Sequence, residues 1–143
     1  MKYYLSSYKL GNELEKLHSL IGQTFGKFGY IPNALDFSNA DPVWKKEYIK
    51  EDMEDLRSNG AEVELLDLKD YFGKEKELGE KMQSLGGVYV SGGNTFVLRQ
   101  AMRISGFDQI FSVLTKRDDF LYIAYSAGVC LLSDNLKFYA MTD

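Results

Sequence analysis

A serine between small residues lies near the end of the chain, where a short apolar run meets an expected helix. The segment Tyr122-Ile123-Ala124-Tyr125-Ser126-Ala127-Gly128-Val129-Cys130 places Ser126 at this junction. A sharp strand-to-helix turn forces strained dihedral angles on its central residue and leaves space only for Gly or Ala two positions away on either side. Ala124 and Gly128 meet that requirement. The pattern predicts a nucleophile elbow that exposes the Ser126 hydroxyl and directs the Ala127 N–H at a developing oxyanion.

A second junction of the same kind comes earlier in the chain. In Val90-Ser91-Gly92-Gly93-Asn94-Thr95-Phe96, paired glycines let the backbone approach a ligand closely, and Asn94 or Thr95 begins the next helix. The segment matches neither the dinucleotide-binding fingerprint nor the phosphate loop with its lysine. Each junction also has a purely structural interpretation, in which the glycines form a tight turn and Ser126 caps a helix. Neither segment alone decides the function.

The elements that must position these junctions are short apolar or aromatic runs that alternate with longer amphipathic ones. We expect strands at Tyr3–Tyr8, Tyr30–Leu35, Val63–Leu68, Gly87–Ser91 and Phe120–Tyr125. We expect helices from Asn12 to Ile21, from Asp41-Pro42 to Asn59-Gly60, from Lys74 to Leu85, from Asn94 or Thr95 to Ile104, and from Gly106 to Lys116. The alternation predicts an α/β fold with a doubly wound, mostly parallel sheet. Functional residues gather at the carboxyl ends of strands in such sheets.

Composition limits the classes of protein that the chain can represent. Its 143 residues are 45% hydrophobic, which is enough for one domain spanning residues 1–143. The net charge is −4, and Lys and Arg do not cluster, which argues against a nucleic-acid partner. The charged stretch from Lys45 to Asp55 predicts the solvated face of an amphipathic helix rather than a docking surface. A small molecule or a peptide is therefore the expected partner.

Cysteine usage and the N-terminal residues indicate where the protein resides. Cys130 is the single cysteine, so an intrachain disulfide framework and a multi-cysteine zinc site are both excluded. The first residues have no long apolar core of a signal peptide, and no run approaches the roughly 18 apolar residues of a membrane span. We expect a soluble, cytoplasmic protein that contacts no membrane.

With both junctions in hand, the sequence resembles the peptidase E (aspartyl dipeptidase) family of serine peptidases. Members carry a Gly-Gly-Asn-Thr-Phe turn and a Ser-Ala-Gly elbow in this order, and here these motifs read Gly92-Gly93-Asn94-Thr95-Phe96 and Ser126-Ala127-Gly128. The resemblance covers nearly the whole chain. It implies a fold similar to the class I glutamine amidotransferases, and cleavage of dipeptides with an N-terminal aspartate by a Ser-His-acid triad. It implies no metal or other cofactor, and it is compatible with a homodimer.

The resemblance also implies a role for particular residues. Ser126 corresponds to the nucleophile, the N–H groups of Gly93 and Ala127 correspond to the oxyanion hole, and Asn94 lines the same pocket. The triad acid follows the elbow, where the candidates are Asp134 and Asp143. Asp143 lies nearer the expected place, although it requires a small insertion and can equally be a frayed last residue.

Two positions depart from the family pattern. Ser91 stands where members often have a third glycine, a change that we expect to be tolerated. The triad histidine belongs downstream of the acid, but the only histidine among these residues is His18, in the first amphipathic helix. Loss of a triad member costs several orders of magnitude in rate, so we expect the 143-residue chain alone to be nearly inactive. The sheet is then incomplete at its C-terminal end, in a truncated product or one whose remaining part was lost.

Other functions remain open at this point. A non-catalytic scaffold or binding protein also explains the missing histidine. A cyanophycinase-like hydrolase on the same scaffold, also acting at aspartyl residues, is a further alternative. A glutamine amidotransferase is disfavoured because that chemistry requires a cysteine at the elbow, and Cys130 lies four residues after Ser126. We interpret Cys130 as a buried structural thiol.

Overall fold

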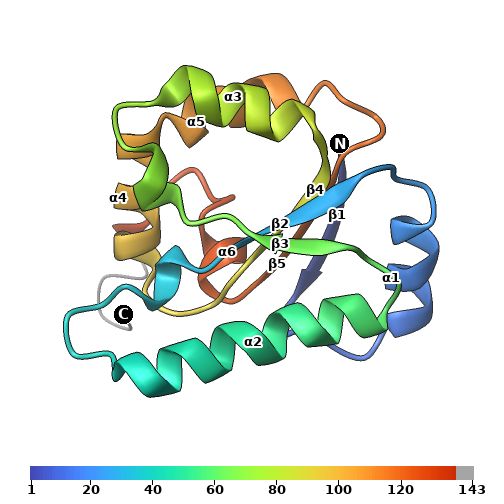
Figure 1. Ribbon diagram of the computed structural model, residues 1–143, viewed down its shortest axis with the longest axis horizontal. Coiled ribbons are helices and arrows are strands. Elements are labelled where there is room, and N and C mark those ends of the chain that lie inside the picture. The colour runs from blue at the N-terminus through green and yellow to red at the C-terminus, as the bar shows by residue number, and fades with distance from the viewer. Residues whose placement is uncertain (138–143) are drawn as a thin grey trace.

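The computed structural model describes residues 1–137 as one layer of parallel strands with helices on both faces (Figure 1). The strands are β1 (Lys2–Ser6), β2 (Lys27–Ile31), β3 (Val63–Leu65), β4 (Leu85–Val90) and β5 (Leu121–Tyr125). They lie in the order β1-β5-β4-β2-β3, and each neighbouring pair in this described part is parallel. The predicted α/β fold is therefore confirmed.

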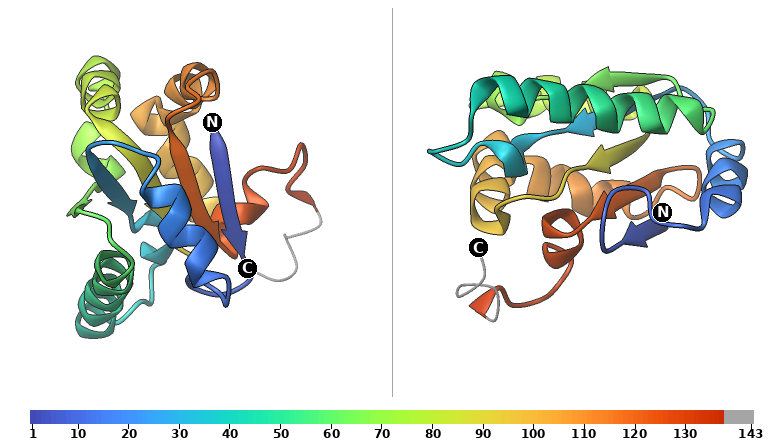
Figure 2. Two further views of the ribbon diagram at one scale, coloured as in Figure 1. Left: turned by 90° about the vertical axis from the view of Figure 1, so that its right-hand side faces the viewer. Right: turned by 90° about the horizontal axis from the view of Figure 1, so that it is seen from below.

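The helices divide between the two faces of the sheet according to the apolar cluster to which each contributes. One face carries α1 (Leu14–Ile21) and α2 (Pro42–Ser58); the other carries α3 (Glu75–Gln83), α4 (Thr95–Ser105), α5 (Phe107–Leu114) and α6 (Ala127–Cys130). Figure 1 and the left view of Figure 2 show α3 and α5 above the strands and α2 below them. Two short 3₁₀ helices, η1 (Asn33–Leu35) and η2 (Leu68–Tyr71), follow β2 and β3. Among the helices described, none combines the length and the apolar character needed to cross a membrane.

The two central strands that lead to the candidate site are buried along their whole length. Every residue of β4 and of β5 is buried, as expected for a parallel sheet covered by helices on both faces. Successive side chains alternate between the faces. Ala124 packs in the cluster that includes α4 and α6, whereas Tyr125 packs in the cluster that includes α1 and α2. The residue directly before Ser126 therefore faces α2.

Several predicted element boundaries are wrong. The strand expected at Tyr3–Tyr8 runs from Lys2 to Ser6. The strand expected at Tyr30–Leu35 begins at Lys27 and ends at Ile31, because Pro32 and the 3₁₀ turn η1 follow it. The strand expected at Val63–Leu68 ends at Leu65. The strand expected at Gly87–Ser91 begins two residues earlier, so Leu85 belongs to β4 and not to α3. The first helix has Glu13 and not Asn12 at its N-cap, and no side-chain hydrogen bond caps it.

The predicted starts of α2 and α4 are confirmed. The Asp41 carboxylate accepts hydrogen bonds from the N–H groups of Val43 and Trp44, with Pro42 in the first turn of α2. The Asn94 side chain accepts a hydrogen bond from the Val97 N–H at the start of α4. These side chains satisfy N–H groups that the first turn of a helix leaves unpaired.

The prediction that the charged stretch Lys45–Asp55 is wholly a solvated face is wrong at one position. Asp52 is fully buried, with an exposed fraction of 0%. The sequence carried a signal for this, since Asp52 lies three residues after Ile49 and four before Leu56, on the apolar side of α2. The structure thus brings a carboxylate into the core.

Asp52 is stabilised there by neighbouring polar groups. Its Oδ2 accepts hydrogen bonds from the hydroxyls of Tyr30 and Tyr125, each at 2.7 Å, and the Lys9 ammonium lies 3.6 Å from its Oδ1. Burial raises the pKa of Asp52 above the ordinary value, although the two phenols and Lys9 favour the charged form. The folded chain therefore holds this proton more tightly than the unfolded chain does.

The raised pKa of Asp52 predicts a specific pH dependence of stability. The stability that it contributes is fully present below the ordinary aspartate pKa of about 4 and is lost as pH rises through the folded pKa. Asp52→Asn removes this titration. As pH rises above about 4, the unfolding free energy of the variant should therefore increase relative to that of the unchanged protein. Urea unfolding of both proteins at several pH values measures it. A difference that is constant with pH would contradict the assignment.

Candidate functional site

The structure brings the two predicted junctions side by side. Strands β4 and β5 are direct neighbours and run in the same direction, so both junctions lie at one edge of the sheet. A Cβ placed on Gly92 would lie 3.0 Å from the Cβ of Ser126. Glycine at position 92 thus allows the first turn to approach the serine closely.

Ser126 occupies the strained turn that the sequence predicts. Its φ of 47° and ψ of −113° lie outside the regions that L-residues ordinarily adopt. Its side chain is exposed, whereas Tyr125 and Ala127 on either side are buried. As the first residue of α6, Ala127 has an N–H that cannot bond within the helix. The turn therefore presents one hydroxyl to solvent at the start of a helix.

The small residues around Ser126 are required by the packing of the turn. A Cβ on Gly128 would lie 3.0 Å from the Cβ of Ala124, from Cγ1 of Val90 and from the Val90 carbonyl oxygen. A larger side chain at either position would push α6 away from the strands. The Tyr122 hydroxyl donates a hydrogen bond of 2.8 Å to the Gly128 carbonyl oxygen. This bond fixes the short helix to its own strand.

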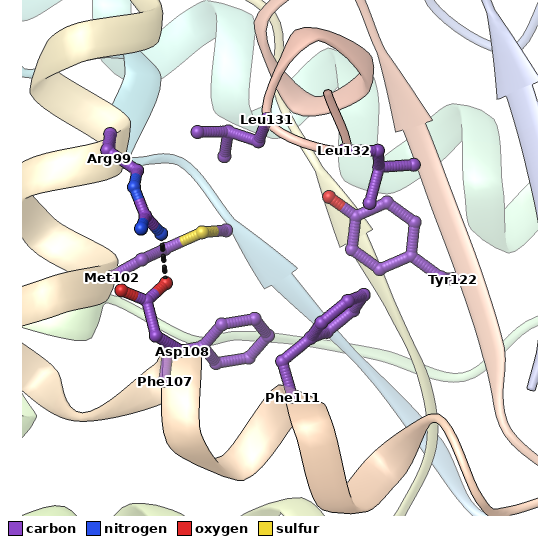
Figure 3. A pocket seen from close by; sticks show the side chains of 8 residues that line it. All are labelled: Arg99, Met102, Phe107, Asp108, Phe111, Tyr122, Leu131 and Leu132. Atoms are coloured by element: carbon purple, nitrogen blue, oxygen red, sulfur yellow. Dashed lines mark hydrogen bonds and ion pairs between the residues drawn. The ribbon is translucent and has the colours of Figure 1, made fainter. Parts of the chain in front are cut away.

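An apolar cavity of about 230 Å³ lies behind this helix (Figure 3). Figure 3 shows Leu131 and Leu132, which follow α6, facing aromatic side chains from α5 and the ring of Tyr122. An ion pair of 2.5 Å between Arg99 and Asp108 stands at one side of the cavity. Ser126 is exposed to solvent and is not among the residues that line this cavity.

The glycine turn is fixed against the loop that follows β2. Gly93 has a φ of 135°, and a Cβ there would lie 2.4 Å from the Ala34 carbonyl oxygen. The same oxygen accepts a hydrogen bond of 2.8 Å from the Asn94 N–H. Ser91, in place of a third glycine, is buried, and its hydroxyl has no hydrogen-bond partner within residues 1–137. Its N–H donates to the Ile31 carbonyl, so the strand end is paired.

A polar cavity opens beside this turn. Its volume is about 750 Å³, and its lining includes Gly93 and Asn94 together with Asp36, Ser38 and Asn39 from the loop after η1. The Asn94 side-chain oxygen caps α4, which leaves its amide nitrogen as the group available to a ligand. Gly93 and Asn94 thus line one cavity, in the turn whose Gly92 approaches Ser126.

His18, the only histidine of the sequence, is not brought to this site. His18 lies in α1, and its Nδ1 is 3.0 Å from the carbonyl oxygen of Asn59. Asn59 follows α2 and precedes β3, so His18 is at the amino edge of the parallel strands, opposite Ser126. Asp134 is exposed in the segment after α6. Asp143 lies outside the described residues, and its role as the acid remains a prediction.

No metal-binding cluster is present in the described part of the chain. Groups of three or more His, Cys, Asp or Glu side chains suited to a metal ion do not occur within residues 1–137. Cys130, in α6, is half-buried, whereas the predicted structural thiol would be fully buried. The turn presents an exposed serine at the N-terminus of α6.

The fold and this turn define an α/β protein of the nucleophile-elbow type. The model of Peptidase family S51 matches residues 5–143, and the chain belongs to this family. No curated protein sequence matches the chain.

Two solved structures are similar to the chain. A crystal structure from Listeria monocytogenes EGD-e, provisionally assigned as a peptidase E, has 27% sequence identity and a TM-score of 0.78. It matches 100% of this chain, which spans 67% of that protein. The structure of a peptidase from an acI-B1 Actinobacterium has 22% identity and a TM-score of 0.62 over 92% of this chain and 56% of its own length, and it supports the fold alone. The predicted relationship to peptidase E is thereby confirmed.

The close contact at Gly93 predicts a large cost for a small substitution. Gly93→Ala places a methyl group against the backbone of Ala34 at a φ that L-residues rarely adopt, so we expect a loss of about 2 kcal/mol or more. Gly79→Ala is the matched control, because no atom lies within 4 Å of its new Cβ in α3. That variant should gain up to about 1 kcal/mol. Thermal or urea unfolding measures both, and equal stability in the two variants would contradict the geometry.

Proposed function

We propose that the protein is a cytoplasmic serine-type dipeptidase of the peptidase E type, with Ser126 as its nucleophile. The observation that carries the proposal is an exposed serine with a φ of 47°, beside Gly92 at the carboxyl ends of neighbouring strands. Non-glycine residues in such conformations cluster at functional sites. Membership of a peptidase family supports the class of reaction. The choice of dipeptides with an N-terminal aspartate as substrates rests on the family resemblance.

The proposed reaction begins with attack of the Ser126 hydroxyl on the scissile carbonyl carbon. The hydroxyl proton passes to a histidine, and the N–H groups of Gly93 and Ala127 stabilise the resulting oxyanion. The histidine then protonates the leaving amine, and water hydrolyses the acyl-enzyme. Asn94 would contact the substrate through its amide nitrogen, in the cavity beside Gly93.

The base is the component that these 143 residues do not supply. His18 is the only histidine in the sequence, and it lies at the opposite edge of the sheet. Lys9 is a poor substitute for a histidine base, because its pKa is raised above the ordinary lysine value. Partial burial lowers this pKa, but the hydrogen bond to Glu51 and the charge of Asp52 together raise it by more. We therefore propose that the 143-residue chain is nearly inactive alone and that the reaction requires a histidine from beyond these residues.

The position of His18 also favours a second candidate, a non-catalytic binding protein on the same scaffold. In that case the polar cavity beside Gly93 and Asn94 would hold a ligand without cleaving it. Both candidates predict that an aspartyl dipeptide binds at this edge of the sheet. Only the first predicts that Ser126 is consumed and regenerated during turnover.

Hydrolysis of an aspartyl dipeptide distinguishes the two candidates. The samples are the 143-residue chain, a form extended at its C-terminus to include a histidine, and the Ser126→Ala variant of that form. We expect turnover in the extended form, a loss of several orders of magnitude in kcat for the variant, and background rates for the short chain. Release of the free amino acids is the measurement.

Two results would contradict this proposal. Equal rates in the extended form and its Ser126→Ala variant would exclude Ser126 as the nucleophile. Binding of the dipeptide without turnover in any extended form would favour the non-catalytic candidate.

A further inference from the structure

Tyr125 links the candidate nucleophile to the buried carboxylate of α2. It directly precedes Ser126, and its hydroxyl donates a hydrogen bond of 2.7 Å to Oδ2 of Asp52. The Tyr48 hydroxyl lies 3.3 Å from the Tyr125 hydroxyl. Burial raises the pKa of Tyr125 above its ordinary value, so the phenol remains a neutral donor. The last residue of β5 is thereby held at both its backbone and the tip of its side chain.

The Tyr125 ring also sets the spacing between the two halves of the site. A Cβ on Gly92 would lie 2.6 Å from this ring, so the glycine turn packs directly against it. Gly92 is next to Gly93, whose N–H is the proposed oxyanion donor. The orientation of a single ring therefore fixes the distance between Ser126 and the glycine turn.

A second strained residue lies at the other end of the same network. Among residues 1–137, Lys9 and Ser126 are the only non-glycine residues with positive φ. Lys9 follows β1, whose last residue, Ser6, pairs in register with Tyr125. The Lys9 ammonium lies 3.0 Å from Glu51 Oε2 and 3.6 Å from Asp52 Oδ1. The Lys9 ammonium therefore lies next to the same carboxylate that accepts the Tyr125 hydrogen bond.

We propose that Asp52 is a positioning residue for the reaction of Ser126 and acts through the Tyr125 hydroxyl. This inference rests on the proposed function of Ser126. The carboxylate holds the Tyr125 ring against the glycine turn and so keeps the serine oxygen within reach of the oxyanion donors. Lys9 compensates the charge that this function places in the core.

Tyr30 provides a matched control for the proposal. Its hydroxyl donates to the same oxygen of Asp52 at the same distance of 2.7 Å, and its ring is also buried. It lies on β2, which β4 separates from β5. A merely structural role for Asp52 predicts equal effects when either phenol is removed. A positioning role predicts an effect on the site from Tyr125 alone.

The test uses a thiol in place of the serine, so that no missing base is required. In a Ser126→Cys, Cys130→Ala background, the pKa of the introduced thiol is obtained from the pH dependence of alkylation by iodoacetamide. Donors aimed at an anion should hold this thiol pKa below about 8.5. Tyr125→Phe should raise that pKa by about half a unit, which lowers alkylation at neutral pH about threefold. Tyr30→Phe should leave the pKa unchanged while losing a similar amount of thermal stability.

Substitution of Asp52 itself provides a second readout. Asp52→Asn retains an acceptor for the phenol and removes a negative charge, so the thiol pKa should stay at or below that of the background. Asp52→Ala removes the acceptor and should match Tyr125→Phe. If only the charge of Asp52 mattered, Asp52→Asn and Asp52→Ala would have the same effect on the thiol pKa.

Each contrary result has a distinct meaning. Equal thiol pKa values in the Tyr125→Phe and Tyr30→Phe variants would overturn the positioning role and leave the proposed function intact. An ordinary thiol pKa of about 8.5 in the background protein would contradict the anion-stabilising site, and with it both proposals.

Discussion

The carboxyl ends of β4 and β5 approach each other so closely that their contact determines how the candidate site is built. Residues at the carboxyl ends of β4 and β5 come so near that a single added Cβ at Gly92 would meet Ser126, and one at Gly128 would meet Val90 and Ala124. Only a sheet with these strands as parallel neighbours brings the glycine turn and the serine together. The absence of side-chain volume at Gly92 and Gly128 is therefore required for the geometry of the candidate site. The strained backbone conformation of Ser126 persists because β4 and β5, which are buried along their whole length, hold the turn in place.

The face of β5 that packs against α2 must accommodate a buried carboxylate. A carboxylate without partners in the core would be strongly destabilising, and Asp52 avoids this through two phenols and a nearby ammonium. Replacing such a cluster by apolar groups often costs little, so its presence beside the elbow points to a requirement other than stability. Tyr125 joins this cluster to the candidate site, because its hydroxyl bonds to Asp52 and its ring packs against the turn at Gly92.

Much of this arrangement was predictable from residue types and spacing. Alternating apolar and amphipathic segments predicted the parallel sheet, and Ala124 and Gly128 predicted the turn at Ser126 because the steric rule is local. The buried position of Asp52 was missed because the surrounding Lys and Glu residues indicate a solvated helix and outweigh the spacing of Asp52 from Ile49 and Leu56. The phenol partners of Asp52, which lie on distant strands, follow only from tertiary packing. The end of β2 at Ile31 was missed because Asn33 is buried by bonds to Asp67 and to the Leu68 N–H, which are distant in sequence.

Binding of a boronic acid analogue of an aspartyl substrate tests the role of Ser126, because boron forms a tetrahedral adduct with a nucleophilic serine without turnover. We expect a tetrahedral boron signal in ¹¹B nuclear magnetic resonance with the 143-residue chain, and its loss in the Ser126→Ala variant. The same signal in both proteins, or only trigonal boron in both, would contradict the assignment of Ser126 as a nucleophile facing oxyanion donors.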